Sequence, residues 1–189
     1  MAHGASAHGR LTSERYFALV DQGVLQPDDR VELLEGVVVA MFPSNPPHAS
    51  TITRVHQVLR EALGPGPVIR EQCSFIASAV SVPEPDVAVV PGVHADYDAR
   101  HPTTALLIVE VSDTSPAQDR LTKSAIYAEA GVPDYGIVNV RDGVVEVYRR
   151  PDPVTRRYAE LRVYGRGERV ELTAFPGATL AVDDLLPGR

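Results

Sequence analysis

The sequence predicts an α/β fold in which helices flank a mixed β-sheet. Short runs rich in β-branched residues recur along the chain, and stretches with helical periodicity interrupt them. The chain has 189 residues, of which 44% are apolar, and this is enough for one buried core. It contains neither an internal repeat nor a linker. We therefore expect a single domain over residues 11–189, preceded by a disordered polar tail over residues 1–10.

The first third of the chain predicts one helix and one hairpin. Thr12 or Ser13 can cap a helix that stops before Gly23. Two valine-rich runs on either side of Glu35-Gly36 predict the hairpin. The expected elements are a helix over residues 13–21, strands over residues 31–34 and 37–41, and a proline-rich loop over residues 43–47.

The remainder of the chain predicts two more helices and most of the sheet. In the longer helix, Ile52, Val55 and Leu59 share one face, and Gly64 ends it. The pair Asp142-Gly143 predicts a tight β-hairpin. The expected helices span residues 48–63 and 119–130, and the expected strands span residues 68–72, 87–90, 106–111, 135–140, 144–149, 158–163 and 170–172.

Composition excludes several classes of protein. No apolar stretch approaches the roughly 20 residues of a membrane span, so we expect no membrane partner. Cys73 is the only cysteine, which excludes an internal disulfide and a cysteine-based zinc site and favours a reducing cytoplasm. The net charge of −7 is unusual for a nucleic-acid binder, although an acidic metal site itself adds negative charge. Four arginines either solvate a hairpin tip or line a phosphate path: Arg149, Arg150, Arg156 and Arg157.

Two carboxylates stand at the margins of strongly β-prone segments. Asp86 follows a proline and opens the apolar run 87–90, and Glu110 lies near the end of the run 106–111. If these strands are neighbours, the two carboxylates converge, and the carbonyl of Val111 can add a third oxygen. Oxygen ligands suit Mg²⁺ or Mn²⁺, which can activate water for attack on a phosphodiester. Two carboxylates placed this close also repel each other and raise a carboxylate pKa.

Lys123 is a candidate for the positive charge of such a site. An ammonium near the carboxylates can orient the attacking water or stabilise negative charge on the phosphoryl group. Lys123 also stands one helical turn after Asp119, so an ordinary pair on an exposed helix face explains it equally well.

Several motifs, taken in their order and spacing, resemble the Uma-two-type family of restriction endonucleases within the PD-(D/E)XK nuclease superfamily. The resemblance covers about Leu11 to Leu186 and implies a restriction-endonuclease-like core, with a mixed β-sheet flanked by helices. The motifs are Glu84-Pro85-Asp86, Glu110-Val111-Ser112, Asp119-Arg120-x-x-Lys123 and the segment from Tyr127 to Tyr135.

The resemblance assigns roles to particular residues. It makes Asp86 and Glu110 the two metal-binding acids. The superfamily's lysine would fall at Ser112, so the amine is expected from Lys123 on the following helix. Further residues match the family at supporting positions: Glu32 as an additional metal ligand, His48 at a helix start, and Ser112 and Asp119 around the ligands.

The expected function is hydrolysis of DNA phosphodiester bonds by a Mg²⁺- or Mn²⁺-dependent endonuclease. Many enzymes of this kind pair two active sites to cut both strands, which leaves a homodimer open. Two alternatives stay open as well. The first is a non-catalytic module that binds nucleic acid or protein on the same fold, and the second is a hydrolase of small phosphodiesters.

Overall fold

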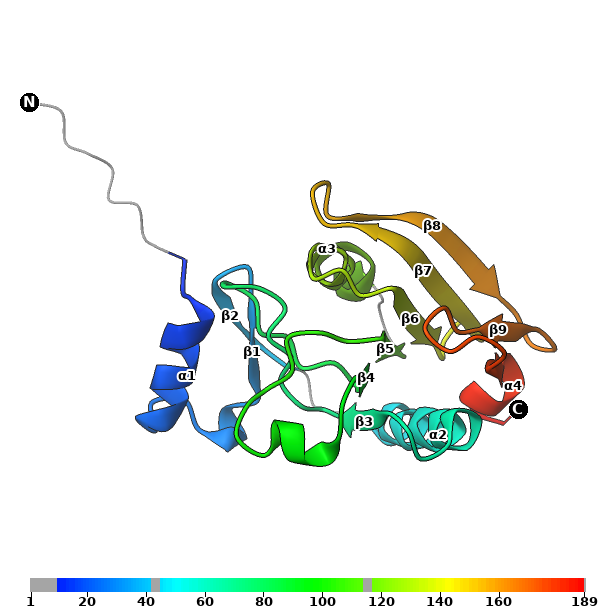
Figure 1. Cartoon of the computed structure of the whole chain (residues 1–189), viewed down its shortest axis with the longest axis horizontal. Coiled ribbons are helices and arrows are strands. Elements are labelled where there is room, and N and C mark those ends of the chain that lie inside the picture. The colour runs from blue at the N-terminus through cyan, green and yellow to red at the C-terminus, as the bar shows by residue number, and fades with distance from the viewer. Residues whose placement is uncertain (1–9, 42–44, 114–116, 189) are drawn as a thin grey trace, which may run out of the picture.

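A six-stranded mixed β-sheet forms the centre of the computed structural model, which describes residues 10–41, 45–113 and 117–188 (Figure 1). The strands lie in the order β3-β4-β5-β6-β7-β8. Central strands β5 and β6 are buried along their whole length, as apolar runs covered on both faces must be. The predicted fold class is therefore confirmed. The strands are β3 (Val68–Glu71), β4 (Val87–Val90), β5 (Leu107–Ser112), β6 (Asp134–Asn139), β7 (Val144–Asp152) and β8 (Arg157–Tyr164).

One parallel pair, β5 and β6, sits among antiparallel neighbours. Parallel strands need a crossover connection, and a helix supplies it here. The predicted α-helix over residues 119–130 opens differently from expectation, as a π-helical segment η3 (Asp119–Lys123), before it continues as α3 (Ser124–Glu129). In this crossover, Lys123 at the end of η3 lies close to Glu110 of β5.

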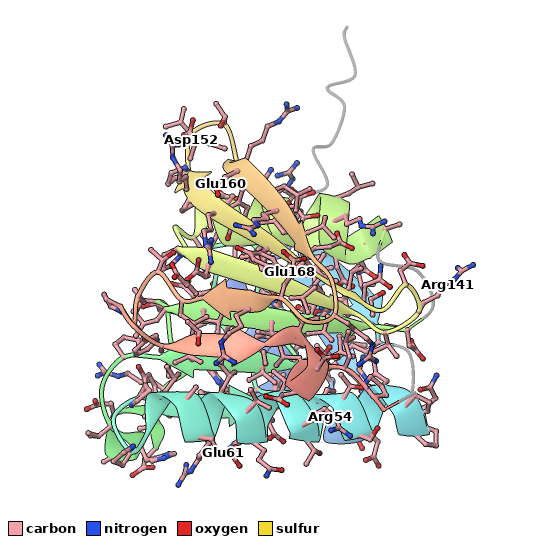
Figure 2. The ribbon with its side chains drawn as sticks, turned by 90° about the vertical axis from the view of Figure 1, so that its right-hand side faces the viewer. Arg54, Glu61, Arg141, Asp152, Glu160 and Glu168 are labelled. Atoms are coloured by element: carbon pink, nitrogen blue, oxygen red, sulfur yellow. The ribbon has the colours of Figure 1, made fainter. Side chains whose placement is uncertain are left out.

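Helix α2 (Pro46–Leu63) covers one face of the sheet. Its apolar side buries Ile52, Val55 and Leu59 against core residues of β4 and β5. The opposite side is solvated, and Arg54 and Glu61 lie there (Figure 2). This division of polar and apolar residues is what the predicted helical periodicity implied.

The start of α2 differs from the prediction by two residues. The predicted helix began at His48 and the predicted loop ran to residue 47, but the helix begins at Pro46. Asn45 caps it, since the Asn45 side chain accepts the backbone N–H of His48 at 3.0 Å. Prolines fit the first turn of a helix, where their missing N–H has no partner to lose.

The opposite face of the sheet carries α3 and an aromatic cluster. The ring of Tyr135 lies 5.0 Å from that of Tyr127, 5.5 Å from that of Tyr148 and 6.1 Å from that of Tyr158, measured between centroids. These rings fill the space between the crossover helix and strands β6 to β8. Aromatic packing therefore fixes the crossover helix on the sheet, and it does so close to Lys123.

The N-terminal segment forms a small unit of its own beside the sheet. It contains α1 (Ser13–Asp21), the short η1 (Pro27–Asp29), and the hairpin of β1 (Val31–Leu34) and β2 (Val37–Ala40). Leu33 forms a backbone bridge with Val82, which ties β1 to the segment that leads into β4. Apart from Arg10, the predicted tail over residues 1–10 lies outside the described residues.

The C-terminal elements are only partly anticipated by the sequence. Strand β9 (Arg169–Glu171) replaces the predicted 170–172, and it pairs with β10 (Thr179–Ala181), which leads into α4 (Val182–Leu185). Neither β10 nor α4, nor the short η2 (His94–Tyr97), was predicted. Pieces of three or four residues carry too little periodicity to be recognised locally. Over the described ranges, no helix has the length and apolar character needed to cross a bilayer.

Candidate functional site

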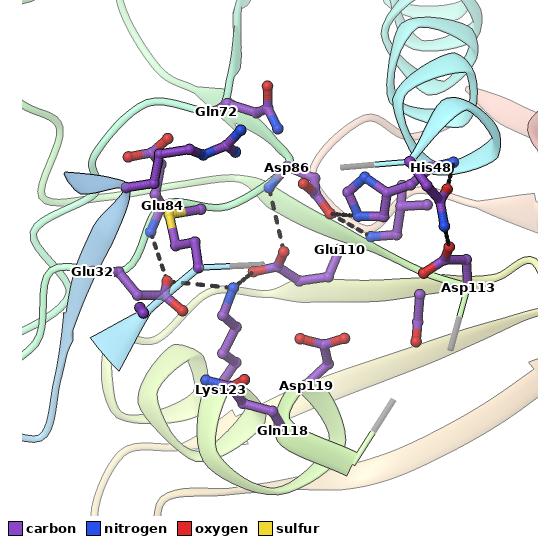
Figure 3. Close-up of a pocket in the computed structure, with 16 residues that line it drawn as sticks. Glu32, His48, Gln72, Glu84, Asp86, Glu110, Asp113, Gln118, Asp119 and Lys123 are labelled. Carbon is purple, nitrogen blue, oxygen red and sulfur yellow. Dashed lines mark hydrogen bonds and ion pairs between the residues drawn. The ribbon is translucent and has the colours of Figure 1, made fainter. Parts of the chain in front are cut away.

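A pocket of ≈ 350 Å³ lies where β1, β4, β5, the first turns of α2 and segment η3 meet (Figure 3). Every residue that the sequence singled out for a site lines this pocket. They are Glu32, His48, Asp86, Glu110, Val111, Ser112, Asp119 and Lys123.

The register of β4 and β5 brings the two predicted acids together. Val87 pairs with Val109, so Asp86 stands beside Glu110 at the next step of this antiparallel pair. The backbone N–H of Asp86 donates to Oε2 of Glu110 at 3.3 Å, and that of Val111 donates to Oδ2 of Asp86 at 2.8 Å. These bonds hold both carboxylates together where β4 begins beside β5.

Glu110 is a buried carboxylate with two further donors. Lys123 Nζ lies 3.0 Å and the hydroxyl of Tyr127 lies 2.7 Å from its Oε1. Burial raises the pKa of Glu110 well above its ordinary value, Lys123 opposes this rise, and Asp86 adds to it. Tyr127 was not among the predicted site residues. Two features of the sequence point to it: it opens the motif from Tyr127 to Tyr135, and it stands one helical turn after Lys123.

Lys123 is the only lysine in a chain with 18 basic residues, and it is buried at this site. Its ammonium points to acids on β5 and β1: Glu110 at 3.0 Å and Glu32 at 3.4 Å. Burial lowers the pKa of Lys123, but Glu110, Glu32 and the nearby Asp119 outweigh burial and hold it above its ordinary value. The alternative of an ordinary pair on an exposed helix face does not apply, because Lys123 lies in a buried charge cluster.

Glu32 is buried on β1, where an ordinary strand residue of a hairpin would be exposed. Its Oε2 accepts the backbone N–H of Glu84 at 3.2 Å. Burial and the charge of Glu32 together raise the pKa of Glu84, which also lines the pocket. The hairpin thus adds negative charge on the side of Lys123 opposite Glu110 (Figure 3).

His48 approaches the site from the first turns of α2. Its Nε2 lies 3.4 Å from Oδ2 of Asp86. The hydrogen bond with Asp86 raises the pKa of His48 above its ordinary value, although burial opposes it. The cap residue Asn45 also donates to Asp113 just beyond β5, so the start of α2 is tied to the end of that strand.

The last two predicted residues lie around this centre. Ser112 is buried at the end of β5. Asp119 is partly buried at the start of η3, and burial raises its pKa to about 6, with Lys123 opposing and Asp86 adding to the rise. The pocket is therefore strongly acidic around the buried ammonium of Lys123, and Arg30 also lines it.

Two of the four arginines near the β7–β8 turn form ion pairs within the molecule, and two are exposed. Arg149 and Arg156 form ion pairs with acidic residues of the molecule itself. Arg150 and Arg157 are exposed. At most two of the four are therefore free of internal ion pairs for contact with a phosphate backbone.

The donors in the pocket fit a hard divalent cation. Asp86 and Glu110 offer carboxylate oxygens, and Val111, which follows Glu110 in the sequence, also lines the pocket and could add its carbonyl oxygen. Within residues 10–41, 45–113 and 117–188, no group of three or more His, Cys, Asp or Glu side chains is arranged to hold a metal ion. Mg²⁺ often binds through one or two carboxylates and keeps several waters, so two carboxylates are sufficient. Glu32 is separated from this pair by the ammonium of Lys123.

The fold is similar to that of a solved protein. A crystal structure described as "a putative nuclease belonging to DUF820", from Anabaena variabilis ATCC 29413, aligns with a TM-score of 0.71 at 16% identity. The alignment covers 93% of this chain and 97% of that one, and this likeness extends to the fold. No curated protein matches the sequence.

The family is established by the sequence match. The Uma2 family, described as "Putative restriction endonuclease", matches residues 13–183. That range contains every strand of the central sheet and every residue that the sequence singled out for the pocket. This chain belongs to the Uma2 family, and its fold is nuclease-like.

Proposed function

We propose that this protein is a divalent-metal-dependent endonuclease that hydrolyses phosphodiester bonds in DNA. One observation carries the proposal: Asp86, Glu110 and Lys123 come from three separate elements and converge on one acidic pocket. Carboxylates for a hard cation and a fixed positive charge are what phosphodiester hydrolysis requires. Membership of the Uma2 family supports nuclease chemistry as the use of this arrangement.

Asp86 and Glu110, with the carbonyl of Val111, are the residues that would hold Mg²⁺ or Mn²⁺. When bound, the cation supplies an acidified water and neutralises negative charge on the phosphoryl group. Tyr127 orients the Glu110 carboxylate, and His48 orients that of Asp86. These contacts keep the oxygens in place before substrate arrives.

Lys123 acts in this proposal as a fixed cation. Because its pKa lies above the ordinary lysine value, the amine stays protonated at neutral pH and does not serve as a general base. It can donate a hydrogen bond to the attacking water or to a non-bridging phosphate oxygen. Negative charge grows on those oxygens as the water attacks, so an ammonium beside them lowers the barrier.

The test combines calorimetric titration of Mg²⁺ and Mn²⁺ with nicking of supercoiled plasmid. Wild type is expected to bind metal and nick DNA, and Asp86→Ala to lose both. Asp152→Ala, at the exposed last residue of β7, is the matched control and should retain both. Metal binding and nicking that persist in Asp86→Ala would contradict the assignment of the site.

Two other outcomes separate the alternatives. Metal binding without nicking, together with turnover of bis(p-nitrophenyl) phosphate, would identify a hydrolase of small phosphodiesters. Absence of both metal binding and hydrolysis in wild type would identify a binding module on a nuclease fold. Either outcome would overturn the proposal of an endonuclease.

A further inference from the structure

Two buried carboxylates, Glu110 on β5 and Glu146 on β7, lie in one row across the sheet. Ile137 of β6 pairs with Glu110 on one side and with Glu146 on the other. Residues paired across neighbouring strands share a face of the sheet. The two strands are therefore two spacings apart, roughly 10 Å. Both side chains project toward the η3–α3 crossover, and each residue is only 3% exposed.

Each of these carboxylates receives one cation from η3. Arg120 donates to both oxygens of Glu146, from Nε at 2.8 Å and from Nη2 at 2.5 Å. Lys123, three residues further on, donates to Glu110 at 3.0 Å. The crossover segment is therefore attached to the sheet at two points, and one of them belongs to the pocket.

The segment between these two points has an unusual backbone. The N–H of Ser124 donates to the carbonyl of Asp119, five residues earlier, and the hydroxyl of Tyr135 donates to the same carbonyl at 3.1 Å. π-Helical turns are rare and are frequent at functional sites. Their extra residue per turn changes the direction in which the following side chains leave the helix. A side-chain anchor at Arg120 can hold that register.

The carboxylate of Glu146 is fully engaged. Besides Arg120, Asn139 Nδ2 and the hydroxyl of Tyr148 each lie 3.3 Å from one of its oxygens. Glu146 is buried, but the Arg120 side chain is 42% exposed, so solvent screening limits what this ion pair adds to stability. Asn139 and Tyr148 fix the Glu146 carboxylate, and this carboxylate in turn fixes the position of Arg120. Arg120 and Lys123 belong to the same segment, so the position of η3 is fixed as well.

We infer that Arg120 and Glu146 are positioning residues, which hold the π-helical register of η3 and so aim the ammonium of Lys123 at Glu110. The kinetic consequence rests on the proposed nuclease function. The aim of Lys123 is a property of the folded protein and can be measured without any activity. Neither Arg120 nor Glu146 lines the pocket, so they act through Lys123.

The single lysine makes this aim measurable. Protein labelled with ¹³C,¹⁵N-lysine has one lysine side-chain signal in an NMR spectrum, and it reports the surroundings of Lys123. Arg120→Gln and Glu146→Gln are expected to shift that signal. They should lower kcat for plasmid nicking at least tenfold, with KM unchanged within about twofold, because only the transition state loses its cation. Glu146→Gln keeps an oxygen for Arg120 and should show the smaller effect.

A second arginine bound to a buried carboxylate provides the matched control. Arg149 Nε lies 2.8 Å from Oδ1 of the buried Asp134, and neither residue lines the pocket. Arg149→Gln should lower the unfolding midpoint while leaving kcat and the lysine signal unchanged.

The outcomes are separable. If Arg120→Gln folds and leaves the lysine signal and kcat at wild-type values, Arg120 has only a structural role and the inference is wrong. If Arg120→Gln does not fold, the same comparison is made with Glu146→Gln. A wild type that nicks no DNA with either metal defeats the proposed function alone, since the lysine signal still decides the positioning role.

Discussion

The ammonium of Lys123 lies 3.0 Å from Oε1 of Glu110, and it provides this buried carboxylate with its nearest positive charge. The contact joins a crossover helix to the central strand beneath it. The same ammonium also lies 3.4 Å from Glu32, so it offsets the charge of two buried carboxylates. The following predictions depend on this contact and on those around it.

Replacing Lys123 by methionine should destabilise the metal-free protein and remove activity. Glu110 and Glu32 would lose their shared counter-charge, and breaking a buried pair costs about 3–5 kcal/mol. Urea unfolding with and without Mg²⁺ measures the loss, and Mg²⁺ should restore part of it. Nicking should fall roughly 10²- to 10³-fold, as for loss of one charge-stabilising donor. Arg54→Met, on the exposed side of α2, is the control, and equal stability of the two variants would refute the prediction.

Tyr127→Phe should weaken the hold on Glu110 without disturbing the aromatic cluster. The variant loses only the hydroxyl that donates to Glu110 at 2.7 Å, and a bond to a charged acceptor contributes about 1.5–3 kcal/mol. Tyr158→Phe is the control, because its hydroxyl donates to the neutral carbonyl of Val132 at 2.9 Å and should cost about 1 kcal/mol. Denaturant unfolding at pH 8 measures both variants. The prediction fails if the control loses as much as Tyr127→Phe.

Asp119→Asn should change how stability depends on pH. Burial raises the pKa of Asp119 to about 6, above the value of about 3.9 in an unfolded chain. The folded state therefore binds this proton more tightly, and the resulting stability is present below pH 4 and is lost as pH rises through 6. The variant lacks this loss. Its stability relative to wild type should increase by roughly 2 kcal/mol from pH 4 to pH 7.5. A difference that stays constant over this range would show that Asp119 is not perturbed.

Asn45→Ala should reduce both stability and nicking. Asn45 accepts the N–H of His48 and contacts Asp113, so its loss frees the start of α2 beside the pocket. Loss of a helix cap costs about 1 kcal/mol. Thr12→Ala removes the cap of α1, which accepts the N–H of Arg15 at 3.2 Å and does not line the pocket. Thermal unfolding should show similar losses in both variants, whereas only Asn45→Ala should slow nicking. Equal nicking rates in Asn45→Ala and Thr12→Ala would show that the cap of α2 does not affect the site, and would contradict the prediction.

Much of the fold could be read from local patterns. The strand over Val87–Val90 and the hairpin around Asp142-Gly143 follow from apolar runs bounded by turn residues, and these signals lie within a few positions of each other. The missed elements are short or irregular and carry little local signal. Strand β10 has only three residues and pairs with β9, and the π-helical segment η3 is hydrogen-bonded to Tyr135 of β6 and Glu146 of β7.

The sequence by itself determined the fold class, the family and the identity of the acids, because residue order, apolar periodicity and motif spacing are properties of the chain. Only the tertiary structure decided which of these groups meet. In the folded protein the ammonium of Lys123 contacts Glu110 and Glu32. Glu32 is buried, and the hydroxyl of Tyr127 binds Glu110. The physical reason is that contact between charges depends on strand register and helix rotation. Both are set by packing between segments that lie far apart in the sequence.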